Sequence, residues 1–117
     1  MSDLDSYLDS RDKEKAVIEA EEERERQSAW QFLLQFCDKN LRASKRLCER
    51  NVAIEVRQQT IILKEPIAGL LENVLDISAL NGGQLFVGGR RVGFYAPEGE
   101  EELKCQIMQC IADKFRL

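Results

Sequence analysis

The sequence predicts an α+β fold in which helices form one layer and a small mixed sheet of three or four strands forms the other. Its 117 residues suffice for a single domain. Apolar residues recur with helical spacing in several segments, whereas others alternate in the manner of strands. The predicted order is a long helix, a strand, a second helix, two strands joined as a hairpin, and a C-terminal helix.

The first 27 residues differ in composition from the rest of the chain. They contain ten acidic and five basic residues, a net charge of −5, whereas residues 28–117 carry +1. Leu4, Tyr7 and Leu8 follow one another at helical spacing and make a short apolar stripe. We therefore expect residues 1–27 to form an acidic arm, helical or partly disordered, and residues 28–117 to form one α+β domain. The apolar stripe is a candidate contact with a partner chain.

Residues 28–51 are predicted to form one long helix that is apolar over much of its circumference. On a helical wheel one group of apolar side chains spans about 100°, and a second group widens the arc to about 200°. The first group is Trp30, Leu33, Leu34, Cys37, Leu41 and Cys48, and the second is Phe32, Phe36, Ala43 and Leu47. The remaining arc is basic and holds Lys39, Arg42, Lys45, Arg46 and Arg50. Such a helix must be covered on two sides, one of them by the acidic arm or a second subunit.

The next segment is predicted to contain one strand and one helix. Residues 52–65 alternate like a strand, and their polar RQQT stretch lacks an Asn-Gly or Asp-Gly pair. We therefore favour one long or bulged strand over a tight turn at this stretch. Pro66 suits the first position of a helix, and Asn81-Gly82 suits its end. The apolar residues between them have helical spacing, namely Ile67, Leu70, Leu71, Val74, Ile77 and Leu80.

The stretch LFVGGRRVGF, residues 85–94, is compatible at first sight with a phosphate-binding loop or a β-hairpin. It lacks the Walker pattern, and a strand pattern rather than a helix follows its glycines. We therefore expect a hairpin with its turn at Gly89-Arg90. Arg90 and Arg91 would then project from the tip, where they could contact an anion or an acidic partner.

A final helix is predicted near the C-terminus. Acidic residues cluster at its start and basic residues at its end, as the helix dipole favours. Its core face is expected to consist of Leu103, Ile107, Met108, Ile111 and Phe115.

The residue types indicate no catalytic, cofactor-binding or metal site. The sequence contains no histidine, the commonest general base. Its four cysteines lie in predicted helices at spacings unlike those of zinc sites, so we expect reduced, buried thiols. The sequence shows neither the apolar core of a signal peptide nor a run of membrane-spanning length. We expect a cytoplasmic protein that does not associate with a membrane.

These observations favour a non-catalytic protein that binds a larger protein as an adaptor, chaperone or inhibitor, and that forms a homodimer. In composition and mixture of elements the chain is similar to small acidic secretion chaperones and phage-encoded inhibitors. The alternative is a nucleic-acid-associated protein that uses the basic helix face and the arginine-tipped hairpin. The residues expected to contact a partner are Leu4, Tyr7, Leu8, Phe32, Phe36, Lys39, Arg42, Arg46, Arg50, Arg90 and Arg91.

Overall fold

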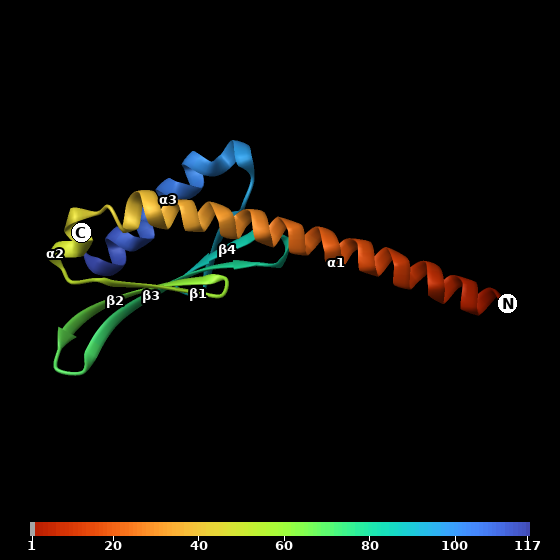
Figure 1. The fold of residues 1–117 in the computed structure, drawn as a ribbon, viewed down its shortest axis with the longest axis horizontal. Helices are drawn as coiled ribbons and strands as arrows, with labels where there is room; N and C mark the ends of the chain where they lie inside the picture. Colours follow the sequence, from red (N-terminus) through yellow and green to blue (C-terminus); the bar gives the residue numbers. More distant parts are fainter. Residues whose placement is uncertain (1) are drawn as a thin grey trace.

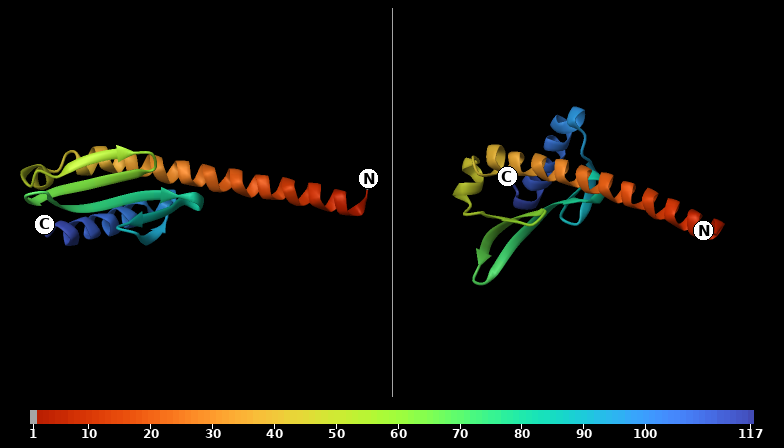
Figure 2. Two further views of the ribbon diagram at one scale, coloured as in Figure 1. Left: turned by 90° about the horizontal axis from the view of Figure 1, so that it is seen from below. Right: turned by 45° about the vertical axis from the view of Figure 1, so that its right-hand side comes forward.

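The computed structural model describes residues 2–117 and confirms an α+β fold. A long N-terminal helix, α1 (Asp3–Phe36), and a C-terminal helix, α3 (Glu100–Phe115), lie on the same face of a five-stranded sheet (Figure 1). The views in Figure 2 show the other face of the sheet free of helices. The molecule measures 67 × 34 × 19 Å, and its length comes from α1, which extends far beyond the sheet.

Helix α1 joins the predicted arm to the predicted domain without a break. The Ser2 hydroxyl caps its N-terminus by accepting a hydrogen bond from the Asp5 backbone N–H at 3.2 Å. The residues from 21 to 27 lack apolar side chains but are good helix formers, so the helix passes through them. The long helix therefore begins at Asp3, not at Ser28.

The chain leaves α1 through a π-helical turn, Cys37–Leu41, instead of continuing as a helix to residue 51. The Arg42 N–H bonds to the Cys37 carbonyl at 2.9 Å, which closes this wider turn. Ser44 is extended, and its hydroxyl caps the short helix α2 (Lys45–Glu49) by accepting from the Leu47 N–H at 3.3 Å. The predicted helix over residues 28–51 is wrong in this half, because a serine cap starts a new helix there.

The sheet is an antiparallel meander with strand order β1-β2-β3-β4-β5. The strands are β1 (Ala53–Arg57), β2 (Thr60–Ala68), β3 (Leu71–Leu80), β4 (Gln84–Val87) and β5 (Arg90–Phe94). The predicted mixed sheet of three or four strands is wrong. Every connection is a short turn, whereas a parallel pair would need a crossover of a dozen residues or more.

The predicted long strand over residues 52–65 is a hairpin. Strands β1 and β2 pair from Ala53 opposite Lys64 to Arg57 opposite Thr60, and Gln58-Gln59 forms the turn. Gln59 has a φ of +67°, the conformation that the second central residue of a type II turn requires. Because glycine or asparagine usually fills that position, the sequence lacked the usual turn signal.

The predicted helix from Pro66 to Asn81 is wrong, because this segment is the end of β2, a turn and β3. Gly69 and Leu70 form the turn, with a φ of +60° at Gly69. In β3, Leu75, Ile77 and Ala79 point into the core, a period of two. Of the six apolar residues that suggested a helix, Ile77 alone is buried. Strand pairing on both sides of β3 overrode the helical spacing.

The predicted hairpin at residues 85–94 is confirmed as β4 and β5, with its turn one residue earlier than expected. Gly88 and Gly89 have φ values of +60° and +78°, which is the type I′ pattern. A bulge then follows, so that Gly93 pairs with Leu85, while Val92 packs partly buried against the core. A Cβ at Gly93 would lie 3.2 Å from the Leu103 side chain, so the glycine lets α3 approach closely.

The core lies between the two helices and the inner face of the sheet. The expected core face of α3 is confirmed for all its residues but Met108, which is largely exposed. The buried side chains are those of Ala29, Phe32, Leu33, Phe36, Cys37, Leu41, Leu47, Ile61, Leu63, Leu75, Ile77, Ala79, Leu85, Val87, Leu103, Ile107, Ile111 and Phe115. Every strand but β1 and β5 contributes a fully buried residue, so the edges of the sheet are the least covered.

Candidate functional site

The predicted partner-contact residues do not form one surface. They divide among the free part of α1, the core, the end of the molecule that carries α2, and the β4–β5 hairpin. Each group therefore has its own role.

The free part of α1, residues 3–22, is called the overhang below. Its side chains are exposed apart from that of Leu8, which is half-buried, and the first buried residue of the helix is Arg26. At 1.5 Å per residue the overhang is about 30 Å long. Leu4 and Tyr7 are each 64% exposed. The residues predicted to dock on a partner are thus accessible.

The apolar side of the overhang continues the side of α1 that packs on the sheet. Leu4, Tyr7, Leu8 and Ile18 fall within about 100° of one another at 100° per residue, and this arc overlaps that of Ala29, Phe32, Leu33 and Phe36. The second group is buried by the sheet. Nothing in the described residues 2–117 covers the first group to the same degree, so a packing face extends into solvent.

Phe32 and Phe36 do not form the expected dimer interface. Their residues are 5% and 1% exposed, and Phe32 also stacks on Tyr95 with ring centroids 5.3 Å apart. Both rings face the sheet because α1 and α3 lie side by side on it and enclose the second apolar side of the helix. Other segments of the same chain therefore bury these rings, whereas we expected a second subunit to bury them.

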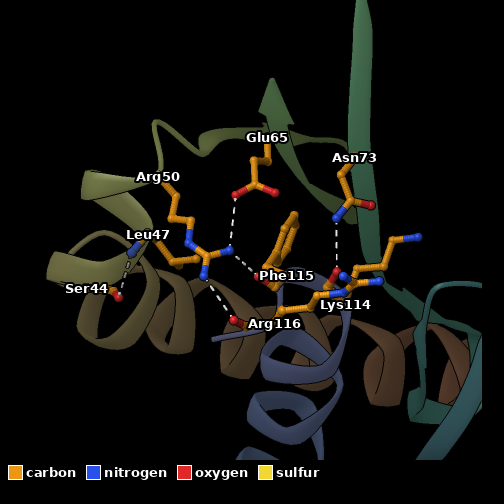
Figure 3. A network of polar contacts seen from close by, with 8 residues as sticks. All are labelled: Ser44, Leu47, Arg50, Glu65, Asn73, Lys114, Phe115 and Arg116. Carbon is orange, nitrogen blue, oxygen red and sulfur yellow. Dashed lines mark hydrogen bonds and ion pairs between the residues drawn. The ribbon is translucent and has the colours of Figure 1, made fainter. Parts of the chain in front are cut away.

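Arg50 is a structural residue rather than a free basic side chain. Its guanidinium group donates to the carbonyls of Phe115 and Arg116, the latter at 2.9 Å, and lies 3.6 Å from a carboxylate oxygen of Glu65 (Figure 3). Asn73 donates to the Lys114 carbonyl at 3.0 Å in the same region. Asn73 of β3 and Arg50, directly after α2, thus cap the last carbonyls of α3, and Glu65 of β2 pairs with Arg50.

The other basic residues of this segment remain exposed at the end of the molecule opposite the N-terminus. Lys39, Arg42, Lys45 and Arg46 lie on the π-turn, the following bend and α2, and Figure 1 shows α2 beside the C-terminus of the chain. Arg42 forms an ion pair with Asp38 at 3.3 Å, and Glu49 is the other acid of this stretch. The break after Leu41 means that these bases form a cluster at one end, called the basic end below, and not an arc along a straight helix.

An apolar groove of about 210 Å³ opens at the basic end, between the π-turn, α2 and α3. Met108 and Leu117 supply its exposed apolar atoms. Its lining is Asn40, Leu41, Ser44, Leu47, Met108, Ile111 and Leu117. No pattern in the sequence indicates this groove, because its walls come from segments more than sixty positions apart in the chain.

The turn between β2 and β3 carries an apolar tip that sequence reasoning missed. Residues 66–71, called the hairpin tip below, extend from the body, and the side chains of Ile67, Leu70 and Leu71 are exposed. Leu70 is fully exposed. Glu65 and Glu72 flank the tip, and it contains no base. The PIAGLL stretch is an apolar run around a glycine, a turn signal that the helical spacing of its apolar residues obscures.

Arg90 and Arg91 are both exposed at the β4–β5 hairpin, as predicted. Arg91 pairs with Phe86 across the strands, and its guanidinium carbon lies 5.0 Å from the centre of the Phe94 ring. These three side chains belong to the helix-free face of the sheet, because their neighbours Leu85 and Val87 point inward. Glu55, Arg57 and Lys64 form an ion-pair group at the other side of that face.

The cysteines have divergent environments. Cys37 is buried, and burial raises the pKa of its thiol, whereas Cys48 and Cys105 are exposed and Cys110 is half-buried. The expectation of buried thiols is therefore wrong for two of the four. Among residues 2–117 no cluster of three or more cysteine and carboxylate side chains is arranged to hold a metal ion.

No protein-family model matches this chain, and no curated protein or solved structure matches it significantly. Within the described part of the chain, no helix has the length and apolar character needed to cross a membrane.

Proposed function

We propose that this protein is a non-catalytic binding protein, an adaptor, chaperone or inhibitor that engages a larger protein through its hairpin tip. The observation that carries this proposal is the exposure of Ile67, Leu70 and Leu71 at the end of a projecting hairpin. Adjacent large apolar side chains in water are unfavourable, and soluble proteins usually keep such patches for binding. The lack of histidine in the sequence supports a non-catalytic role.

The charges around the hairpin tip specify the partner's chemistry. Glu65 and Glu72 flank the apolar residues, and Glu72 is exposed. An anionic lipid surface or a nucleic acid would be repelled by the Glu72 carboxylate, whereas Glu65 is paired with Arg50. The partner that fits is a protein with an apolar cleft rimmed by lysine or arginine side chains.

The test begins with isolation of the natural partner from the source cells, followed by a binding titration with the two purified proteins. Leu70→Asp together with Leu71→Asp should weaken binding by about tenfold or more, because anchor residues dominate such interfaces. Val17→Asp places the same charge at an exposed apolar site elsewhere and should leave the affinity unchanged. Equal affinities for the hairpin variant and the wild type would refute the role of the tip.

A second candidate function is the binding of single-stranded nucleic acid on the helix-free face of the sheet. It is supported by the exposed Phe94 ring with Arg91 over it and by Phe86 on the adjacent strand. Aromatic side chains on neighbouring strands stack bases in several nucleic-acid-binding folds. Asp76 and Glu55 lie on the same face, which favours the protein-binding proposal over this one.

Titration of a fluorescent oligonucleotide over a salt series distinguishes the two functions. A nucleic-acid-binding protein would lose affinity steeply with salt, and Phe94→Ala would weaken it further. No binding at low salt would eliminate this candidate and leave the protein-binding proposal untouched.

A further inference from the structure

We infer that the chain associates with itself head to tail, with the overhang of one copy docked on the basic end of the next. This inference concerns residues other than the hairpin tip and goes beyond the proposed partner binding. It rests on three features of the molecule: the charge of its two ends, an apolar face at one end, and an apolar groove at the other.

The two ends of the molecule carry opposite charge. Residues 3–22 contain eight acidic and three basic side chains, a net charge of −5. At the opposite end in Figure 1, residues 37–50 contain five basic and two acidic side chains, a net charge of +3. Arg50 is engaged with α3 and Glu65, but Lys39, Lys45 and Arg46 are exposed and free to face a second chain.

The apolar features of the two ends are also complementary. Leu4, Tyr7 and Leu8 project from one side of the overhang, near its end. The groove at the basic end presents Met108 and Leu117 above the buried Leu47. Its volume of about 210 Å³ accommodates one or two leucine-sized side chains, so a short apolar stripe fits it better than a whole helix face.

Charge also argues against pairing between two overhangs. Two helices of net charge −5 side by side would bring like charges together along their whole length. The same charge repels nucleic acid and anionic lipid. The basic end of a second copy relieves this repulsion and covers the apolar stripe at once.

The geometry of the contact has a consequence for the assembly. Because the donor surface and the acceptor surface differ, each bound copy still offers a free overhang or a free basic end. Association is therefore heterologous and continues into short open chains, or closes into a ring if the rotation permits. The twofold dimer predicted from Phe32 and Phe36 is replaced by this arrangement, since both rings are buried within one chain.

Sedimentation velocity on the full-length protein tests the inference. At low salt and increasing concentration, the wild type should form species larger than 13.4 kDa, and higher salt should dissociate them. An overhang variant, Leu4→Asp with Leu8→Asp, and a basic-end variant, Lys45→Glu with Arg46→Glu, should each weaken association by about tenfold or more. Circular dichroism melting must show that both variants remain folded.

Mixing the two variants provides the decisive measurement. In a head-to-tail contact, each variant alone lacks one partner surface, but a one-to-one mixture retains one intact overhang and one intact basic end. The mixture should therefore form a complex of two chains that grows no further. If the mixture stays monomeric while the wild type associates, the contact is not head to tail and the inference is wrong.

Three controls keep the interpretation specific. Val17→Asp lies on another side of α1 and should associate like the wild type, as should Arg90→Glu with Arg91→Glu at the distant hairpin. The hairpin-tip variant, Leu70→Asp with Leu71→Asp, should also associate normally, which separates this inference from the proposed partner binding. A wild type that stays monomeric at 0.5 mM, on the order of the weakest specific contacts, would overturn the inference outright.

Discussion

The guanidinium group of Arg50 lies at the C-terminal end of α3 and donates to the Arg116 carbonyl at 2.9 Å. Sixty-six positions separate the two residues, so this contact ties the segment after α2 to the end of the chain (Figure 3). Arg116 itself takes a left-handed conformation with φ 54°, which ends the helix and exposes the carbonyls that Arg50 binds.

Replacement of Arg50 by alanine should lower the free energy of unfolding by about 1–2 kcal/mol, because charged hydrogen bonds to helix-terminal carbonyls are lost. Arg46→Ala, an exposed neighbour on the same short helix, should change stability by less than about 0.5 kcal/mol. Urea unfolding of both variants measures the difference. Equal losses would show that Arg50 contributes no more than a surface side chain.

Substitutions in the turn between β4 and β5 should destabilise the protein through backbone strain and not through a steric clash of the new side chain. Gly89 has a φ of +78°, and no atom lies within 4 Å of the position that a Cβ would occupy. Gly89→Val should therefore cost about 1–2 kcal/mol through strain alone, whereas Gly89→Asn should cost clearly less. Thermal melting of the pair is the measurement, and similar losses for both residues would contradict the type I′ assignment.

Phe36 should be essential for folding and not for association. The residue is 1% exposed, so Phe36→Ala should cost about 3–5 kcal/mol and Phe36→Asp should prevent folding. Tyr7→Ala on the overhang should cost less than about 0.5 kcal/mol. Circular dichroism and urea titration distinguish these cases. A folded Phe36→Asp protein would place the ring at the surface instead.

Removal of residues 2–20 should leave the body folded with its melting temperature almost unchanged. These residues bury no side chain against the sheet, and the first buried residue of α1 is Arg26. Differential scanning calorimetry of the shortened and full-length proteins gives the comparison. A marked fall in melting temperature at protein concentrations that keep both monomeric would mean that the overhang covers part of the body.

Stability should depend on pH through Glu55. Hydrogen bonds from Lys64 and then Arg57 lower the pKa of this carboxyl below its ordinary value of 4.5 in the folded protein. A lowered pKa means that the ionised form stabilises the fold above pH 4.5, and that this contribution disappears as pH falls through the folded-state value. Glu55→Gln should therefore be less stable than the wild type at pH 7, with a difference that shrinks toward pH 3 in urea titrations. A difference independent of pH would exclude this ion-pair group as its cause.

Prediction from the sequence worked best where neighbouring residues along the chain settle the structure. The C-terminal helix and the β4–β5 hairpin follow from dipole-matched charges and from two adjacent glycines, which act within a few residues. It failed where two local signals compete. Residues 66–81 have helical spacing, but Leu75, Ile77 and Ala79 also alternate, and pairing with β2 and β4 decided for a strand.

The candidate surfaces were predicted only in part, because contacts between distant segments of the chain decide which side chains stay exposed. Leu4, Tyr7, Arg90 and Arg91 are exposed as expected and Leu8 is half-buried, since no segment among residues 2–117 folds over theirs. Phe32, Phe36 and Arg50 were assigned to a partner, but distant segments of this chain engage them. The apolar groove at the basic end was missed, because α2 and α3 meet only in the folded protein.

By itself the sequence determined the C-terminal helix, the charge of the N-terminal segment and the presence of the β4–β5 hairpin, because helix propensity, dipole matching and turn preferences are short-range effects. Only the tertiary structure decided that the sheet has five antiparallel strands, which side of α1 is buried at each point along its length, and which basic side chains remain free. Those outcomes depend on contacts between segments far apart in the chain. Whether a side chain is buried depends on the segment that packs against it. A linear pattern identifies an apolar face but does not identify the segment that covers that face.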